Sequence, residues 1–148
     1  MIKIDESIRF QNVLSYHTSF HYRDMQKELE RFYTLIDELK LKKEGPLFYA
    51  LYNVPKDEIM DVDFFMPIRE MVTETGELMF HSYYSVENMM ATYVFGDYEN
   101  QMEGAYASLL AFLEQSKLET TTPFYHLIDK DYVKLMLGYG RVSVEEEV

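Results

Sequence analysis

Four histidines are the first residues in this 148-residue chain that suggest chemistry. On a strand, His17 and His21 would share a face but lie about 13 Å apart at ~3.3 Å per residue, which is too far for one metal ion to bridge. None of the four has an acidic partner at a helical spacing such as HExxH, the pattern of many zinc sites. We therefore predict no metal site, and we keep only His126, which follows Tyr125 on a predicted strand, as a candidate for lining a ligand groove.

Two acidic side chains stand inside predicted strands, where charge is uncommon. Glu87 lies within Ser85–Met90, and Asp63 lies between Val62 and Phe64. On a solvent-facing strand surface, either carboxylate needs no special explanation. On a groove face, it would be desolvated and would need a cationic or hydrogen-bonding partner. We take both as candidate polar anchors for a ligand.

No catalytic motif stands out in the sequence. There is no G-x-S-x-G nucleophile elbow, no G-x-x-x-x-G-K phosphate loop and no G-x-G-x-x-G fingerprint. The segment Gly138-Tyr139-Gly140 is interpreted as a strand end. We predict no catalytic residue. Hydrolysis of a bound ligand is the weakest alternative, because it needs Glu87 or another acid beside an open pocket.

Aromatic residues are the positive indication of binding. The chain has 13 Tyr, 10 Phe and 10 Met but no Trp, and each buried tyrosine hydroxyl needs a hydrogen-bond partner. Tyrosine and methionine suit a surface that accepts varied apolar shapes. Even spacing places Tyr93 and Phe95 on the face of Glu87, and Phe65 on the face of Asp63. We expect these faces to line an aromatic groove; the alternative is a face closed by its own side chains or by a dimer partner.

Charge and composition limit the classes of partner. The net charge of −12, from 26 acids and 14 bases, repels phosphate backbones and anionic lipid surfaces, so we expect neither nucleic acid nor membrane binding. The chain has no cysteine, which excludes disulfides and thiolate metal sites. The charged start MIKIDESIRF is not a signal peptide, and no apolar run approaches the ~20 residues that cross a bilayer. We expect a cytoplasmic monomer or homodimer without a cofactor.

The chain is predicted to form a single domain, residues 1–148, in which one unit occurs twice. Residues 1–9 are expected to be a short segment before the first long strand, and the first repeat is expected to cover about residues 8–70. In it, apolar residues at steps of three and four predict a helix at 25–43, which Gly45-Pro46 ends. Strands are expected at 10–22, 47–53 and 62–68, with a connection at 54–61 and a polar linker at 70–78.

The second repeat, about residues 82–142, has the same order of elements. A strand at 83–95 precedes a helix at 101–117, with Asp97 or Asn100 as its cap. A loop at 120–122, strands at 124–128 and 132–139 and an acidic tail at 143–148 follow. The repetition predicts an α+β fold: duplicated strand–helix–strand–strand units form an antiparallel sheet with two helices on one face and a ligand groove at the pseudo-twofold seam.

The predicted core consists of strand residues that pack under the two helices. Its strand members are Val62, Phe64, Met66, Met90 and Val94, and its helix members are Leu29, Phe32, Ile36, Leu109 and Phe112.

Three features resemble those of a known family: the alternating strand Val62–Pro67, its counterpart Val133–Gly138 and the duplicated order of strands and helices. Over roughly Ile8–Val142, the chain resembles the effector-binding domain shared by the gyrase inhibitory protein and the multidrug-sensing transcription activators. The resemblance implies an aromatic pocket at the seam, in which one buried Glu pairs with cationic aromatic ligands. Lys134 stands at the position of that Glu, and Asp63, its first-repeat counterpart, is the acid that would replace it.

These observations predict a non-enzymatic domain that binds a small aromatic or apolar ligand. If Asp63 and Lys134 both face the seam, they pair and leave a slot for neutral or anionic ligands. The alternative is a protein-interaction or chaperone-like module, since the chain is also similar to small stand-alone proteins of Gram-positive bacteria, some of them encoded near secreted toxin systems. No DNA-binding helix pair precedes the domain, so we expect no fused transcription factor. The predicted ligand-binding residues are Tyr49, Asp63, Phe65, Glu87, Tyr93, Phe95, His126 and Lys134.

Overall fold

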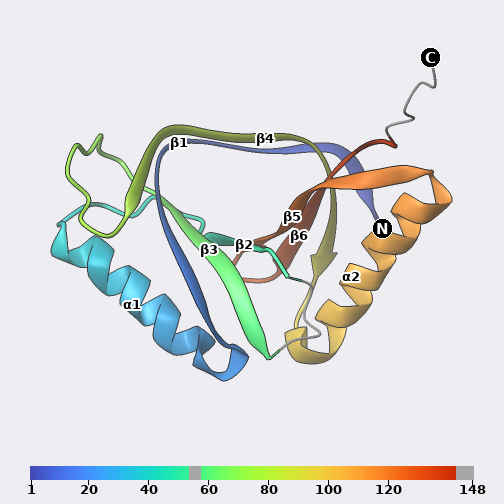
Figure 1. The fold of residues 1–148 in the computed structure, drawn as a ribbon, viewed down its shortest axis with the longest axis horizontal. Coiled ribbons are helices and arrows are strands. Elements are labelled where there is room, and N and C mark those ends of the chain that lie inside the picture. Colours follow the sequence, from blue (N-terminus) through green and yellow to red (C-terminus); the bar gives the residue numbers. More distant parts are fainter. Residues whose placement is uncertain (54–57, 143–148) are drawn as a thin grey trace, which may run out of the picture.

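The computed structural model describes residues 1–53 and 58–142, in which two successive runs of elements follow the same order (Figure 1). The first run is β1 (Lys3–His21), the short 3-10 helix η1 (Tyr22–Asp24), α1 (Met25–Glu38), β2 (Phe48–Leu51) and β3 (Ile59–Pro67). The second run is β4 (Met79–Val94), α2 (Tyr98–Gln115), β5 (Leu118–Ile128) and β6 (Val133–Arg141). The predicted α+β fold with its strand–helix–strand–strand order is confirmed.

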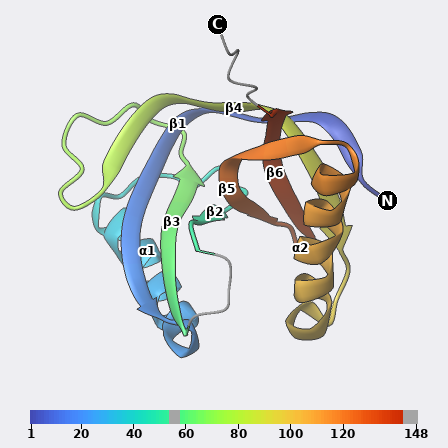
Figure 2. The same ribbon diagram turned by 45° about the vertical axis from the view of Figure 1, so that its right-hand side comes forward.

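The strands close into an antiparallel ring in the order β1-β3-β2-β5-β6-β4. Within each run, the third strand pairs with both the first and the second. The two runs meet where corresponding strands pair, β1 with β4 and β2 with β5. Figure 2 shows α1 and α2 outside the ring, one beside each run. The sequence predicted the sheet but not its closure, by which each of the six described strands has a neighbour on both sides.

Helix α1 begins where the sequence predicts and ends earlier. Its residues Phe32 and Ile36 are fully buried against the strands, as the apolar spacing requires. The helix ends at Glu38 rather than Lys43. Lys40 has a φ of 57°, and this left-handed conformation stops a helix.

Other expected boundaries are wrong as well. The short segment expected at 1–9 belongs largely to β1, which begins at Lys3 and pairs with β4. Strand β4 begins at Met79 rather than Tyr83. Helix α2 begins at Tyr98, three positions before the expected start; Asp97 is its N-cap residue and accepts the Gln101 N–H through its backbone carbonyl at 2.9 Å, without a side-chain cap hydrogen bond.

Strand β5 runs through residues 120–122, where Pro123 indicated a loop. The register between β5 and β6 shifts in this stretch, and Pro123 is tolerated because such an irregularity needs no ladder N–H from it. The Thr122 hydroxyl accepts a hydrogen bond from the backbone N–H of Gly138 at 2.8 Å. A Cβ at position 138 would lie 2.5 Å from Thr122 Cγ2, so this close approach requires glycine.

An outer core joins both helices to the ring. The predicted core residues Val62, Phe64, Met66, Met90, Phe32, Ile36 and Leu109 all belong to it, with Leu29 and Phe112 packed at its margin. Val94 is buried but lies outside this cluster.

An inner core of aromatic side chains fills the inside of the ring. Phe48, Phe65, Tyr84 and Tyr125 come from four strands, and every pair of their ring centroids lies between 4.7 and 6.5 Å apart. Tyr84 belongs to β4, which pairs with none of the other three strands, so these contacts cross the interior. The seam between the repeats is thus occupied by the chain's own rings.

Part of the expected connection at 54–61 and all of the acidic tail at 143–148 lie outside the described residues. Within the described residues, neither helix has both the length and the apolar character needed to cross a bilayer.

Candidate functional site

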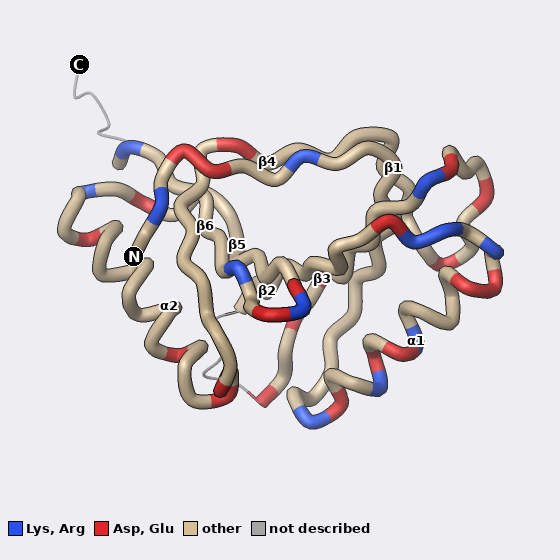
Figure 3. Tube along the Cα trace, turned by 180° about the vertical axis from the view of Figure 1, so that it is seen from behind, with Lys and Arg blue, Asp and Glu red and all other residues tan. Residues whose placement is uncertain are grey.

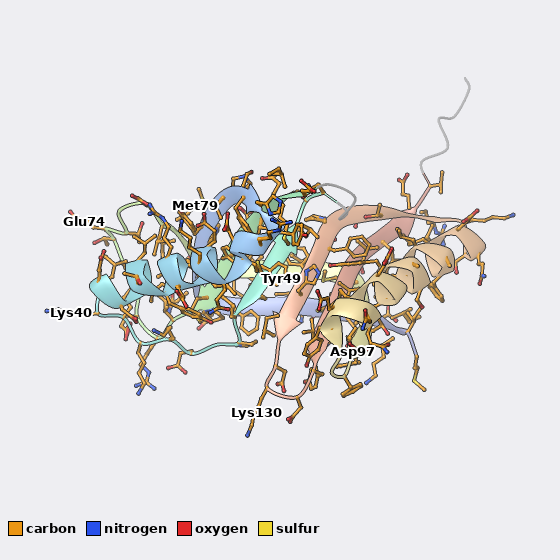
Figure 4. The ribbon with its side chains drawn as sticks, turned by 90° about the horizontal axis from the view of Figure 1, so that it is seen from below. Lys40, Tyr49, Glu74, Met79, Asp97 and Lys130 are labelled. Atoms are coloured by element: carbon orange, nitrogen blue, oxygen red, sulfur yellow. The ribbon has the colours of Figure 1, made fainter. Side chains whose placement is uncertain are left out.

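A cavity of about 340 Å³ opens beside the inner core, between β1, β3 and the start of β4. Its lining residues are Ser15, Tyr16, His17, Asp63, Phe65, Glu77, Met79, His81 and Tyr84, and we call it the Asp63 pocket. Its volume falls within the range of about 300–1,000 Å³ that is usual for small-molecule sites. Figure 4 shows Met79, at the rim, in the half of the molecule that carries α1, whereas Asp97 lies in the other half.

Strand register brings the pocket residues together. On β1 and β3, His17 is paired with Asp63, and Ser15 is paired with Phe65. Ser15 is also paired with Met79 on β4. Because residues two positions apart point to the same face of a strand, all of these side chains gather on one side of the three strands.

The Asp63 carboxylate is held in place by two neighbours. One oxygen lies 2.6 Å from His17 Nδ1, and the other accepts a hydrogen bond from the Tyr52 hydroxyl at 2.5 Å. Burial, reinforced by this hydrogen bond to Asp63, raises the pKa of Tyr52, so the hydroxyl stays protonated and donates. His17 Nε2 in turn lies 2.9 Å from Asp61. The side chain of Asp63 is 20% exposed, which keeps the carboxylate accessible and partly shielded from water.

Ser15 and His81 form a hydroxyl–imidazole pair on the pocket wall. Ser15 Oγ lies 2.9 Å from His81 Nε2. Burial lowers the pKa of His81, and the charge of Asp63 opposes this only partly. The pair resembles a nucleophile and its base. Among the described residues, however, no carboxylate lies within 4.0 Å of either His81 nitrogen, so the third member of a catalytic triad is not in place.

Aromatic rings form the inner wall of the pocket. Phe65 is 3% exposed and stacks on Phe48 with a centroid distance of 4.7 Å. The hydroxyls of Tyr84 and Tyr125 lie 2.6 Å apart, and burial raises the pKa of Tyr84. A ligand in the pocket would therefore meet neutral, rigid rings.

The outer rim connects the pocket to helix α1. Arg31 donates from Nε to the Tyr16 hydroxyl at 3.0 Å and from Nη2 to Glu77 at 3.1 Å. Met79, on the same rim, is 62% exposed. Glu77 is thus neutralised by a cation from the helix, which leaves Asp63 as the lining acid without a Lys or Arg partner among the described residues.

The predicted ligand-binding residues do not all gather in one place. Asp63 and Phe65 line the Asp63 pocket. Tyr49 and His126 instead face the outer core, where their rings stack at 4.2 Å. Glu87 lies on the surface and binds Arg9 at 2.6 Å, away from the pocket lining.

His126 is fully buried and bonds through Nε2 to the Tyr106 hydroxyl. Its Nδ1 has no hydrogen-bond partner among the described residues. Burial lowers the pKa of His126 to about 3. The residue is therefore a neutral part of the outer core.

The remaining candidates, Tyr93, Phe95 and Lys134, lie in the second repeat. The Lys134 ammonium is 2.9 Å from Glu6 and 5.6 Å from the Tyr93 ring centroid. The hypothesis that it pairs with Asp63 is wrong. The two residues occupy corresponding strands of different repeats, since Asp63 on β3 is paired with β1 and Lys134 on β6 is paired with β4.

The sequence did not predict the lining residues Ser15, His17, His81 and Tyr84, nor Tyr52, which donates to Asp63 from outside the lining. Ser15 and His81 are 66 positions apart, and only the β1–β4 register brings them into contact. His17 was considered only as a metal ligand. One indication was present in the sequence: His17 and Ser15 are two positions apart, which puts both side chains on the same face of a strand.

The chain belongs to the protein family described as Domain of unknown function (DUF5085), whose profile matches residues 9–145. No curated protein matches the chain.

Several solved structures share the fold at low sequence identity. The C-terminal domain of EcmrR has a TM-score of 0.70 and 15% identity, over 96% of this chain and 99% of that domain. A protein from Listeria innocua described as a hydrolase has a TM-score of 0.60 and 12% identity, over 95% of this chain and 90% of that one. SAV2435 bound to tetraphenylphosphonium has a TM-score of 0.52 and 12% identity, over 95% of this chain and 93% of that one. At such identities, the likeness concerns the fold.

Proposed function

We propose that this protein binds small aromatic ligands, preferentially cations, in the Asp63 pocket, and that it does so without chemical conversion. The observation that carries the proposal is a partly shielded carboxylate, Asp63, in the same cavity as the rings of Phe65 and Tyr84. A carboxylate beside aromatic faces complements a ligand that is both flat and positively charged.

The charge around the pocket favours a cation. Among the described residues, the cavity lining contains no Lys or Arg, and the chain carries a net charge of −12. Figure 3 shows acidic segments in both helices and in the connections of both halves. His81, with its pKa lowered by burial, adds no positive charge at neutral pH. A desolvated carboxylate in such a field gains from a cationic partner.

Two solved structures of the same fold support the proposal that the ligand is an aromatic cation. SAV2435, which shares the fold, is bound to tetraphenylphosphonium, an aromatic cation. The C-terminal domain of EcmrR has the same fold. We therefore infer that this chain is a divergent effector-binding domain. In it, Asp63, rather than the residue at position 134, supplies the acidic side chain that meets the ligand.

A thermal-shift series with three isosteric probes tests the proposal. Naphthylmethylammonium, naphthalenemethanol and naphthoate share one ring system and differ in charge. The cation is expected to raise the Tm by about 5–10 °C at a hundredfold excess over its Kd, more than the neutral alcohol, and Asp63→Asn is expected to remove the shift caused by the cation but not a shift caused by the anion. A cation that raises the Tm no more than the alcohol, or equally in the wild type and in Asp63→Asn, would contradict the proposal.

A second candidate function is the binding of a protein partner. It is favoured by the filled inner core together with large apolar side chains on the surface, among them Met71 and Tyr83, which are 74% and 57% exposed. The net charge would select a basic partner. Co-purification of a basic protein from the native cell, lost in Met71→Glu or Tyr83→Glu, is the expected result; recovery of the chain alone at native expression levels would count against it.

A further inference from the structure

A second cavity lies at the other end of β4, beside the start of β1. It has a volume of about 350 Å³ and is lined by Met1, Lys3, Tyr93, Phe95 and Tyr132. None of these residues lines the Asp63 pocket. We call Lys3, Tyr93, Phe95 and Tyr132 the Lys3 site.

Three aromatic rings hold one another in a fixed arrangement at the Lys3 site. Tyr93 and Phe95 stack with centroids 6.2 Å apart. Tyr132 meets both edge-on, at 5.1 Å from Tyr93 and 5.7 Å from Phe95. Phe95 is nevertheless 71% exposed. A preorganised aromatic group with an exposed ring offers a flat ligand both a face and an edge to pack against.

The charge at the Lys3 site is positive, in contrast to the protein as a whole. Lys3 Nζ lies 5.3 Å from the Tyr93 ring centroid, and Lys134 Nζ lies 5.6 Å from the same ring. The Lys134 ammonium is occupied by Glu6 at 2.9 Å. Across residues 1–53 and 58–142, Lys3 forms no ion pair. Lys3, like the α-ammonium of Met1, which also lines the cavity, can thus meet a ligand without first breaking an ion pair within the described chain.

The two repeats carry opposite charge at corresponding places. In the first repeat, the β1–β3 register pairs His17 with the acid Asp63. In the second repeat, the β4–β6 register pairs Tyr93 with the base Lys134. The Asp63 pocket and the Lys3 site thus differ in electrostatic preference: an acid of β3 lines the first, and the Lys3 ammonium of β1 lies beside the aromatic rings of the second.

We propose that the Lys3 site binds a small, flat aromatic anion. The Lys3 ammonium pairs with the ligand's carboxylate or sulfonate, and the ligand's ring packs against Phe95 and Tyr132. The distance of Lys3 from the Tyr93 ring places the cation beside the aromatic surface, so one ligand can satisfy both contacts. This site does not depend on the function proposed for the Asp63 pocket, because the two cavities share no residue.

Amide NMR titrations of the full chain test this proposal with naphthoate as the anion and naphthylmethylammonium as the matched cation. Naphthoate is expected to shift the resonances of Lys3, Phe95 and Gly96 saturably and to leave those of Ser15 and His17 unchanged. Lys3→Gln is expected to weaken naphthoate binding about threefold, and Phe95→Ala about tenfold. Lys27→Gln removes the same charge from an exposed position on α1 and is expected to leave the affinity within twofold.

Three results would overturn the proposal. One is the absence of naphthoate-induced shifts at Lys3 and Phe95. Another is equal weakening by Lys3→Gln and Lys27→Gln, which would show a general charge effect. The third is binding of naphthoate at Ser15 and His17 instead. Failure of the cation to shift Ser15 and His17 would contradict only the function proposed for the Asp63 pocket, so the two outcomes remain distinct. The amide spectrum of each variant also reports whether it is folded.

Discussion

The Asp63 carboxylate already holds two hydrogen bonds, yet it has capacity for a ligand. An ionised carboxylate offers about four acceptor positions, and His17 and Tyr52 use one on each oxygen. These bonds fix the direction of the remaining positions. A ligand that donates an N–H to Asp63 therefore meets an oriented acceptor and does not have to order it, which reduces the entropic cost of binding.

His126 is a residue whose burial predicts a pH dependence of stability. Because burial lowers its pKa to about 3, the unfolded chain, with an ordinary pKa of about 6.5, takes up the proton first. This contribution to stability is complete above about pH 6.5 and decreases as the pH falls toward 3. The free energy of unfolding is expected to fall by about 2 kcal/mol more between pH 6.5 and pH 5 in the wild type than in His126→Gln.

Urea denaturation at the two pH values measures this difference. Other titrating groups contribute equally to both proteins, and glutamine retains an acceptor for the Tyr106 hydroxyl. The same loss of stability in the wild type and in His126→Gln would show that the imidazole is not kept neutral by burial.

At the scale of elements, the contact between β5 and β6 depends on the missing side chain of Gly138. A Cβ there would lie 2.5 Å from Thr122 Cγ2 and 2.6 Å from Thr121 Oγ1. Gly138→Ala is expected to lower the free energy of unfolding by about 1–3 kcal/mol. Gly104 on α2 has no atom within 4 Å of an added Cβ, and Gly104→Ala is expected to raise stability by about 0.5–1 kcal/mol. Chemical denaturation of both variants checks the contrast; destabilisation of similar size in both would contradict it.

Helix α2 offers a second test, with two adjacent leucines. Leu109 is fully buried in the outer core, whereas Leu110 is 39% exposed. Leu109→Ala is expected to cost about 2–5 kcal/mol of unfolding free energy, and Leu110→Ala less than about 1 kcal/mol. Thermal or urea denaturation measures both. Equal costs would mean that α2 does not pack on the ring through the face described.

The sequence predicts the strand faces and the helices well, because their periodicity is a local property. The alternation at Val62–Pro67 places Phe64 outward and Phe65 inward, as observed. Element ends are harder to predict, because a single backbone conformation decides them: Lys40 ends α1 in the left-handed region. The β5 irregularity at Pro123 was missed because its hydrogen bonds depend on Gly138 of another strand.

Closure of the ring determines where space for a ligand remains. The long β1–β4 pairing brings Tyr84 across the interior to Phe48 and Tyr125. The seam is therefore filled, and free space remains toward each end of β4. The sequence predicts one groove that contains Asp63 and Phe65 together with Tyr93 and Phe95, whereas these residues line two separate cavities, because the β1–β4 register is a long-range property that no local pattern encodes.

Calorimetric titration of naphthylmethylammonium tests the claim that Asp63 selects an aromatic cation. Asp63→Asn retains an oxygen that accepts from Tyr52 while removing the charge, and Glu87→Gln removes the same charge from a surface residue that binds Arg9. We expect Asp63→Asn to weaken binding by about tenfold or more, the loss of a charge-assisted contact, and Glu87→Gln to leave the Kd within twofold. Equal Kd values for the two variants and the wild type would contradict the claim.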